Sequence, residues 1–146
     1  MLTTDNLLYL TQMISNFCGV YSINCLPKLQ ALSCNNAVLN QQNQQQHHQL
    51  TKLVIMNLDT DNLPGSHWVA MFINNGIAEI FDSFGVPPPP LLQAWAAQNL
   101  LKWIYEPLIM IQHPDTVTCG YYALVFCLVR PECKTLLDAI HYINTL

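Results

Sequence analysis

Charged residues are scarce in this sequence: Asp, Glu, Lys and Arg make up 10% of its 146 residues, whereas 51% are hydrophobic. Globular domains usually carry about a quarter charged residues, so we expect most helices and strands here to be packed on more than one side. With only five Lys and Arg and a net charge of −4, the chain lacks the cationic surface that a nucleic-acid backbone requires. We therefore expect one compact domain over residues 1–146 and no nucleic-acid partner.

Long apolar runs are also missing. The longest, Tyr121 to Val129, is far shorter than the roughly 18 residues of a membrane-spanning helix, so we expect a soluble protein without membrane contact. The first residues carry no basic segment ahead of an apolar block, which gives no signal for secretion. An intracellular protein should keep its six cysteines as thiols. No C-x-x-C pair occurs among them, and no zinc or redox motif is predicted.

A polar tract rich in Gln and Asn, residues 35–49, has little apolar area to bury, and we expect a mobile surface loop there. His47 and His48 lie in it without a cysteine or carboxylate at ligand spacing, so no metal site is predicted. Before the tract, Thr3 or Thr4 can cap a helix that ends near Asn16. That helix should turn Leu7, Leu10, Met13 and Ile14 inward.

Strand patterns follow the tract at residues 53–58, 67–73 and 77–82. The second is apolar on both alternating faces, which predicts a strand in the middle of a sheet. After a proline run, apolar spacing predicts a helix from Pro90 to about Tyr105, with Leu100 and Trp103 inward, and then a strand over 108–112. A buried helix from Cys119 to Arg130 should end at Pro131, and a last amphipathic helix should run from Glu132 to about Asn144.

The second and third strand patterns predict a hairpin that brings His67 close to Asp82. With a two-residue turn at Asn74 and Asn75 the two residues face each other, and with a three-residue turn they are offset by one. Opposed Cβ atoms lie about 5 Å apart, so the carboxylate can accept the imidazole N–H and fix its tautomer. For this pair alone, two solvated side chains at a strand end are the simpler interpretation.

Cys119 begins the most apolar helix of the chain, where free N–H groups and the helix dipole favour a thiolate, and a histidinium partner favours it further. Gly120 has no side chain and would let a substrate backbone approach. Gln112 ends the strand predicted before this helix, and the intervening loop can bring its amide beside the sulfur as an oxyanion donor, worth about 3 kcal/mol. Cys127 and Cys133 are expected to be buried as small hydrophobes.

Three blocks of this sequence resemble the signature blocks of the adenovirus-type, or adenain-like, cysteine proteases: Gly65-Ser66-His67-Trp68, Phe81-Asp82-Ser83-Phe84-Gly85, and Gln112 through Cys119-Gly120-Tyr121. The order His, acidic residue, Gln, Cys is circularly rearranged relative to papain and shared with the SUMO- and NEDD8-specific peptidases. The resemblance implies an α+β fold of the papain-like cysteine protease type, circularly rearranged, whose central mixed sheet packs against the nucleophile helix. By this resemblance Cys119 is the nucleophile, His67 the base, Asp82 the residue that holds the base, and Gln112 the oxyanion donor, while Trp68 packs beside the histidine.

The resemblance implies a viral cysteine endopeptidase that matures capsid or core precursor proteins, often after glycine-containing motifs, in the virion and the infected host cell, whether cytoplasm or virus factory. No cofactor is required for the chemistry. Adenoviral enzymes use DNA and a short peptide as cofactors; five basic residues argue against DNA activation here, and an activating peptide stays open. The short chain, its negative charge and Asp82 in place of the usual Glu favour a virophage or a Maverick/Polinton-like element.

Two other functions stay open. A SUMO- or ubiquitin-like modifier peptidase would apply the same chemistry to a folded modifier, although SUMO peptidases resemble this chain less, with one residue fewer between Gln and Cys and an aspartate where Thr118 stands. A non-catalytic module that binds glycine-containing peptides would keep the fold, but it has no need for the set of Cys, His, Asp and Gln.

Overall fold

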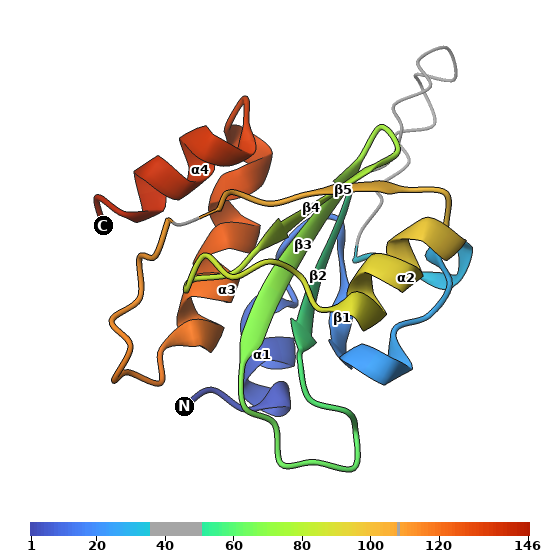
Figure 1. The fold of residues 1–146 in the computed structure, drawn as a ribbon, viewed down its shortest axis with the longest axis horizontal. Helices are drawn as coiled ribbons and strands as arrows, with labels where there is room; N and C mark the ends of the chain where they lie inside the picture. The colour runs from blue at the N-terminus through green and yellow to red at the C-terminus, as the bar shows by residue number, and fades with distance from the viewer. Residues whose placement is uncertain (36–50, 108) are drawn as a thin grey trace.

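The computed structural model describes residues 1–35, 51–107 and 109–146 (Figure 1). In these residues five strands form one sheet and are, in spatial order, β1 (Phe17–Ser22), β2 (Lys52–Asn57), β3 (Trp68–Asn74), β4 (Ile77–Phe81) and β5 (Lys102–Ile104). Antiparallel pairing joins β2, β3 and β4, whereas β1 runs parallel to β2, and β5 parallel to β4. The sheet is therefore mixed, as predicted, and its three central strands lie within about one residue of the predicted ones.

Helices cover both faces of this sheet (Figure 1). On one face lie α3 (Cys119–Val129), α1 (Thr4–Thr11) and α4 (Leu136–Ile143), and on the other lies α2 (Pro90–Gln98). The side chains of β3 divide between them because successive residues of a strand point to opposite faces. Those packed with α3 are Trp68, Ala70 and Phe72, and those packed with α2 are Val69, Met71 and Ile73. The double-sided apolar pattern of β3 thus predicted its central place correctly.

Helix α1 begins at the predicted cap but ends early. The hydroxyl of Thr3 accepts the N–H of Asn6, and the Asn6 side chain accepts the N–H of Thr3, so both ends of a capping box are present. The helix ends at Thr11 rather than near Asn16, which takes a positive φ of 63° as the chain turns into β1. Met13, predicted to face inward, is consequently 84% exposed.

The helix predicted from Pro90 to about Tyr105 is in fact a helix and a strand. Leu100 has a positive φ of 57° and reverses the chain after α2, so its side chain is 92% exposed instead of inward. Trp103 then lies in β5, paired with Ala78 of β4. The apolar spacing of this stretch fits both arrangements, and the sequence pattern alone did not reveal the break.

Pro131 lies between the last two helices, after the end of α3 and before the start of α4. α3 starts at Cys119 as predicted, and a short 3-10 turn, Arg130–Glu132, follows its end. α4 starts only at Leu136, where Thr135 forms a second capping box, and is shorter than predicted. No helix in the described part of the chain is long and apolar enough to cross a membrane. Apart from Asn35, the polar tract 35–49 lies outside the described residues.

A buried ion pair ties the end of α3 to the sheet. The guanidinium of Arg130 binds both carboxylate oxygens of Glu79 in β4, donates to the carbonyl of Cys133 at 2.7 Å, and lies 4.5 Å from the centre of the Phe72 ring. The two charged side chains are only 7% and 14% exposed. Each charge is therefore compensated mainly by the other.

Replacing Arg130 with alanine is expected to destabilise the fold by about 3–5 kcal/mol, because the carboxylate of Glu79 is left buried without a partner. Denaturant unfolding of the purified variant measures this loss. Lys134→Ala removes an exposed cation from the same region and should stay within about 0.5 kcal/mol of the unchanged protein. Equal losses of unfolding free energy in Arg130→Ala and Lys134→Ala would show that the ion pair of Arg130 with Glu79 does not stabilise the fold.

Candidate active site

His67 and Asp82 lie side by side where β3 begins and β4 ends. Nε2 of His67 is 2.9 Å from Oδ1 of Asp82, and the two side chains are 15% and 6% exposed. The same carboxylate oxygen accepts the backbone N–H of Phe84 at 2.7 Å. The carboxylate is thus held from the backbone, and it fixes the orientation of the imidazole so that Nδ1 remains for another partner.

The hairpin that makes this contact has a different register from the predicted one. It turns at Asn75 and Gly76, whose φ values of 50° and 74° suit a type I′ turn, and not at Asn74 and Asn75. In the observed register Ala70 pairs with Phe81, so His67 and Asp82 do not face each other directly, and the prediction of direct opposition was wrong. The prediction that the two are neighbours agrees with the structure.

Phe84 lies in the turn after β4, where the N–H of Gly85 donates to the carbonyl of Asp82 at 2.9 Å. The ring of Phe84 stacks on the imidazole of His67, with centroids 4.9 Å apart and planes inclined by 24°. Gly85 follows with a φ of 67°, and a Cβ at this position would lie 2.8 Å from the carbonyl oxygen of Ile109. Within the turn from Asp82 to Gly85, Asp82 thus binds the edge of the imidazole and Phe84 stacks on its face. The turn needs glycine at position 85 because a side chain there would collide with the backbone of Ile109.

Cys119 is the first residue of α3 and is 3% exposed. Burial raises the pKa of its thiol, but hydrogen bonding with His67 and with the backbone N–H groups of Trp68 and Gly120, together with the imidazolium charge, lowers the pKa below its ordinary value. These contacts bring the predicted nucleophile together with the predicted base. They also explain physically why the thiolate is favoured at this position.

The pKa of His67 moves in the opposite direction. Burial alone would lower it, but the hydrogen bonds with Asp82 and Cys119 and their negative charges raise the pKa to about 9. Both shifts favour the charged forms, thiolate and imidazolium, and the two groups titrate as one coupled pair. Such a pair provides a nucleophile and a proton donor.

Gln112 is buried, with 2% exposure, in the segment that leads to α3. Residues 109–112 form no strand, contrary to the prediction, and Leu108 lies outside the described residues. Instead, the N–H groups of Ile111 and Gln112 both donate to the carbonyl of Ser83, at 2.9 and 3.0 Å. Side-chain Nε2 of Gln112 donates to the carbonyl of Thr116 at 3.0 Å, so the amide is held inside the loop before Cys119.

Trp68 packs between α3 and the N-terminal segment. A Cβ on Gly120 would lie 3.0 Å from Cδ1 of Trp68 and 3.2 Å from Cβ of Leu2. The indole Nε1 also donates to the carbonyl of Leu2 at 3.0 Å. The absence of a side chain at Gly120 thus makes room for the indole of Trp68. The sequence had instead suggested that this space would admit a substrate backbone.

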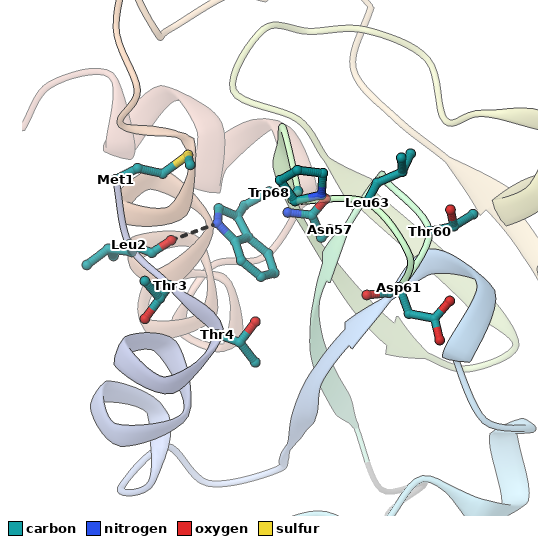
Figure 2. Close-up of a pocket in the computed structure, with 12 residues that line it drawn as sticks. Met1, Leu2, Thr3, Thr4, Asn57, Thr60, Asp61, Leu63 and Trp68 are labelled. Atoms are coloured by element: carbon teal, nitrogen blue, oxygen red, sulfur yellow. Dashed lines mark hydrogen bonds between the residues drawn. The ribbon is translucent and has the colours of Figure 1, made fainter.

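A pocket of about 300 Å³ opens beside Trp68 (Figure 2). Its walls are the N-terminal residues Met1–Thr4, the loop after β2, and the indole itself. Thr60 and Asp61 line it with polar groups. Trp68 directly follows His67 in the chain, but His67, Asp82, Gln112 and Cys119 do not line this pocket.

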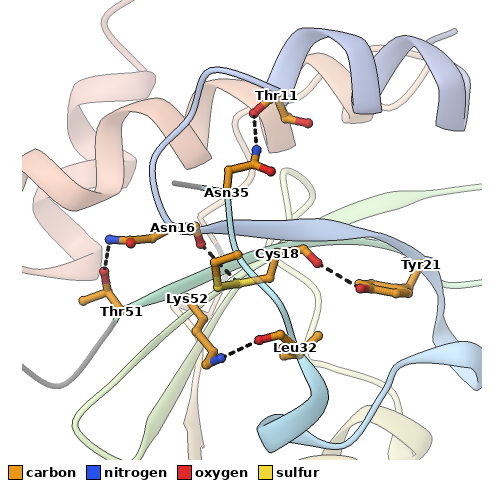
Figure 3. Close-up of a disulfide and its surroundings, with 9 residues drawn as sticks. Thr11, Asn16, Cys18, Tyr21, Leu32, Asn35, Thr51 and Lys52 are labelled. Carbon is orange, nitrogen blue, oxygen red and sulfur yellow. Dashed lines mark hydrogen bonds between the residues drawn. A yellow bond between two sulfur atoms is a disulfide. The ribbon is translucent and has the colours of Figure 1, made fainter. Parts of the chain in front are cut away.

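One pair of cysteines contradicts the expectation that all six are thiols. Cys18 in β1 and Cys34 form a disulfide (Figure 3). The pairing follows from the fold: Asn35 donates its N–H to the carbonyl of Phe17 at 2.8 Å, which brings the neighbouring Cys34 beside the strand. Composition could not show this, because the contact joins segments that are distant in sequence.

The other cysteines agree better with prediction. Cys127 is fully buried in α3, and burial raises the pKa of its thiol, so it behaves as a small hydrophobe. Cys133 is half-buried. Within the described ranges no three His, Cys, Asp or Glu gather as a metal site, and His47 and His48 lie outside them.

Sequence reasoning gave no role to Ser83 or Phe84. Both lie in the block that was recognised, directly after Asp82, but nothing in their spacing showed that one contacts Gln112 and the other His67. The available signal was the glycine at 85, which marks a tight turn between two candidate residues.

No protein-family model matches this chain, and no curated protein matches it. Among solved structures it is similar to the crystal structure of the ASFV pS273R protease, with 25% identity and a TM-score of 0.51 over 62% of this chain and 38% of that one. The chain thus spans well under two thirds of that protease's length. The match shows that this mixed sheet with its helices is similar to the fold of a viral cysteine protease, and it supports a protease as the class of protein.

Proposed function

We propose that this chain is a viral cysteine endopeptidase in which Cys119 is the nucleophile, His67 the general acid and base, Asp82 its orienting residue and Gln112 an oxyanion donor. The observation that carries the proposal is that one half-buried imidazole lies 2.9 Å from the carboxylate of Asp82 and also interacts with Cys119, with the pKa of His67 raised and the pKa of Cys119 lowered, which favours imidazolium and thiolate. A histidine that served only packing would have no need for either charged neighbour. In chain order these residues correspond to a circularly rearranged papain-like enzyme.

The chemistry proceeds through an acyl-enzyme. The Cys119 thiolate attacks the scissile carbonyl carbon and forms a C–S bond, while the electron pair of the carbonyl moves to its oxygen. The backbone N–H of Cys119 and the amide of Gln112 stabilise that oxyanion. As it collapses, the C–N bond breaks and His67 gives its proton to the leaving amine. His67 then takes a proton from water, which attacks the thioester and releases the acid and the thiolate.

The substrates in this proposal are viral capsid or core precursor polypeptides, cut after glycine-containing motifs. The resemblance of the three sequence blocks and the likeness to a viral protease support a viral substrate. The enzyme would act in the virion and the infected cell, without nucleic acid, since its net charge is −4; a peptide activator is compatible with it.

Purified protein incubated with a library of glycine-containing peptides, and with the precursor proteins encoded beside it, tests the proposal. Mass spectrometry should find cleavage that depends on Cys119 and follows glycine. Probes carrying SUMO- or ubiquitin-like modifiers run in parallel. Reaction with those probes alone would replace the endopeptidase by a modifier peptidase, and specific peptide binding without any cleavage would indicate a non-catalytic module.

The pH dependence of peptide cleavage follows from the two shifts. The active pair is thiolate and imidazolium, so kcat/KM should rise as Cys119 loses its proton, at a pH below the ordinary thiol pKa of 9.0, and fall as His67 loses its proton near pH 9. Steady-state rates across this range measure both limbs. An alkaline limb near the ordinary imidazole pKa of 6.5 would contradict the assigned contacts.

A further inference from the structure

The side-chain amide of Gln112 has two ends of nearly equal shape, and only the N–H end can stabilise an oxyanion. Which end faces the reacting group depends on the hydrogen bonds around the amide. In this structure Oε1 accepts the hydroxyl of Ser83 at 2.5 Å, and Nε2 donates to the carbonyl of Thr116 at 3.0 Å. One N–H of the amide is left for another acceptor.

The opposite orientation of this amide is disfavoured by the carbonyl of Thr116, whereas the Ser83 hydroxyl, which can donate or accept, anchors the end of the amide that it contacts. If the amide were turned over, Oε1 would face the carbonyl of Thr116, and two acceptors would oppose each other. The contact with Ser83 is buried, since Ser83 is 1% and Gln112 2% exposed. Water therefore cannot readily take the place of the Ser83 hydroxyl if that hydroxyl is removed. The hydrogen bond consequently holds the Gln112 amide more strongly than it would at the surface.

Ser83 also holds the backbone that carries Gln112. Its carbonyl accepts the N–H groups of both Ile111 and Gln112, so main chain and side chain are positioned by one residue. Ser83 directly follows Asp82, whose carboxylate orients His67. The base and the oxyanion donor, which come from distant segments, are thereby positioned by two successive residues of one turn.

Resting on the proposed function, we infer that Ser83 is a positioning residue for oxyanion stabilisation: its hydroxyl anchors Oε1 of Gln112, so that the remaining N–H of the amide is held toward the reacting carbonyl. The hydroxyl is distinct in action from Asp82, because it affects the oxyanion and leaves the ionisation of Cys119 unchanged. Ser83→Ala should therefore slow reactions that pass through an oxyanion and spare those that do not.

Two reactions of Cys119 separate these cases. Acylation by 4-nitrophenyl acetate forms a tetrahedral oxyanion, whereas alkylation by iodoacetamide displaces iodide at a saturated carbon and forms none. Ser83→Ala should slow acylation about 10-fold to 100-fold, approaching the effect of Gln112→Ala, with the alkylation rate unchanged. The double variant should be no slower than Gln112→Ala. Ser15→Ala, which removes an exposed hydroxyl, is the matched control and should match the unchanged protein in both reactions.

Several outcomes overturn this role. Acylation of Ser83→Ala within about twofold of the unchanged protein would do so, as would additive losses in the double variant. If Ser83→Ala loses acylation and alkylation in parallel, the role of Ser83 is structural only. In that case Ser83→Thr, which keeps the hydroxyl, should fail to restore acylation selectively. If the unchanged protein shows no acylation at Cys119, the proposed function falls and the inference with it, whereas normal acylation in Ser83→Ala together with slowed acylation in Gln112→Ala removes the inference alone.

Discussion

Replacing Cys119 with alanine is expected to abolish peptide cleavage while the fold stays intact. In the proposed chemistry no other group can form the C–S bond, and removing the nucleophile of such a set typically costs about 10⁴-fold or more in rate. The change deletes one buried atom at the first turn of α3, which should cost only about 1 kcal/mol of stability. Cleavage assays and thermal unfolding of the same preparation measure the two effects.

Cys25→Ala provides the matched control for this variant. Cys25 is an exposed free cysteine, and burial and the nearby Asp61 raise the pKa of its thiol, in contrast to Cys119. Cleavage should be unchanged in Cys25→Ala. Iodoacetamide near neutral pH should label Cys119 before Cys25, as judged by peptide mass spectrometry. Cleavage retained in Cys119→Ala, or preferential labelling of Cys25, would contradict the assignment of the nucleophile.

The central strands were predictable because their chemistry is local. Short apolar runs define β2, β3 and β4, and Asn and Gly at the hairpin mark a turn. The register was harder to obtain, since both Asn74-Asn75 and Asn75-Gly76 are acceptable turn pairs. Because the turn lies one residue further along the chain, Asp82 does not face His67 directly, yet the two side chains are in contact.

The parts that prediction missed depend on contacts between distant segments. α2 ends before Leu100 because the chain returns to the sheet as β5, which no helical period reveals. Residues 109–112 look like a strand, yet their N–H groups at Ile111 and Gln112 are satisfied by one carbonyl of a turn. The disulfide of Cys18 with Cys34 likewise follows from the pairing of Asn35 with β1, which composition cannot encode.

The candidate residues themselves were found through their types and their places at element ends. His67 precedes a central strand, and Cys119 begins an apolar helix, both visible in the sequence. What holds them was not visible: the stacking of Phe84 and the hydroxyl of Ser83 act through the fold of one turn. A role that depends on which atom contacts which partner can be assigned only from the three-dimensional structure.

Asp82 offers the second large effect, because it supplies both orientation and charge to His67. In Asp82→Ala the imidazole loses its acceptor at Nε2 and the negative charge that opposes burial. We expect kcat/KM to fall about 100-fold or more. Measurements of kcat/KM over about five pH units, from roughly pH 5 to 10, cover both limbs of the pH profile and determine the loss. The thermal midpoint of the same preparation checks that the variant is folded.

Asp82→Asn separates orientation from charge, since its side-chain oxygen can still accept the imidazole N–H but carries no charge. Without that charge, burial lowers the pKa of His67 from about 9, and the alkaline limb of kcat/KM should move to lower pH. The loss at the optimum should be smaller than in Asp82→Ala, because the ring stays oriented and stacked on Phe84. An alkaline limb that stays near pH 9 in Asp82→Asn would mean that the carboxylate charge does not set the ionisation of His67. Equal losses in the two variants would instead make charge, and not orientation, the contribution of Asp82.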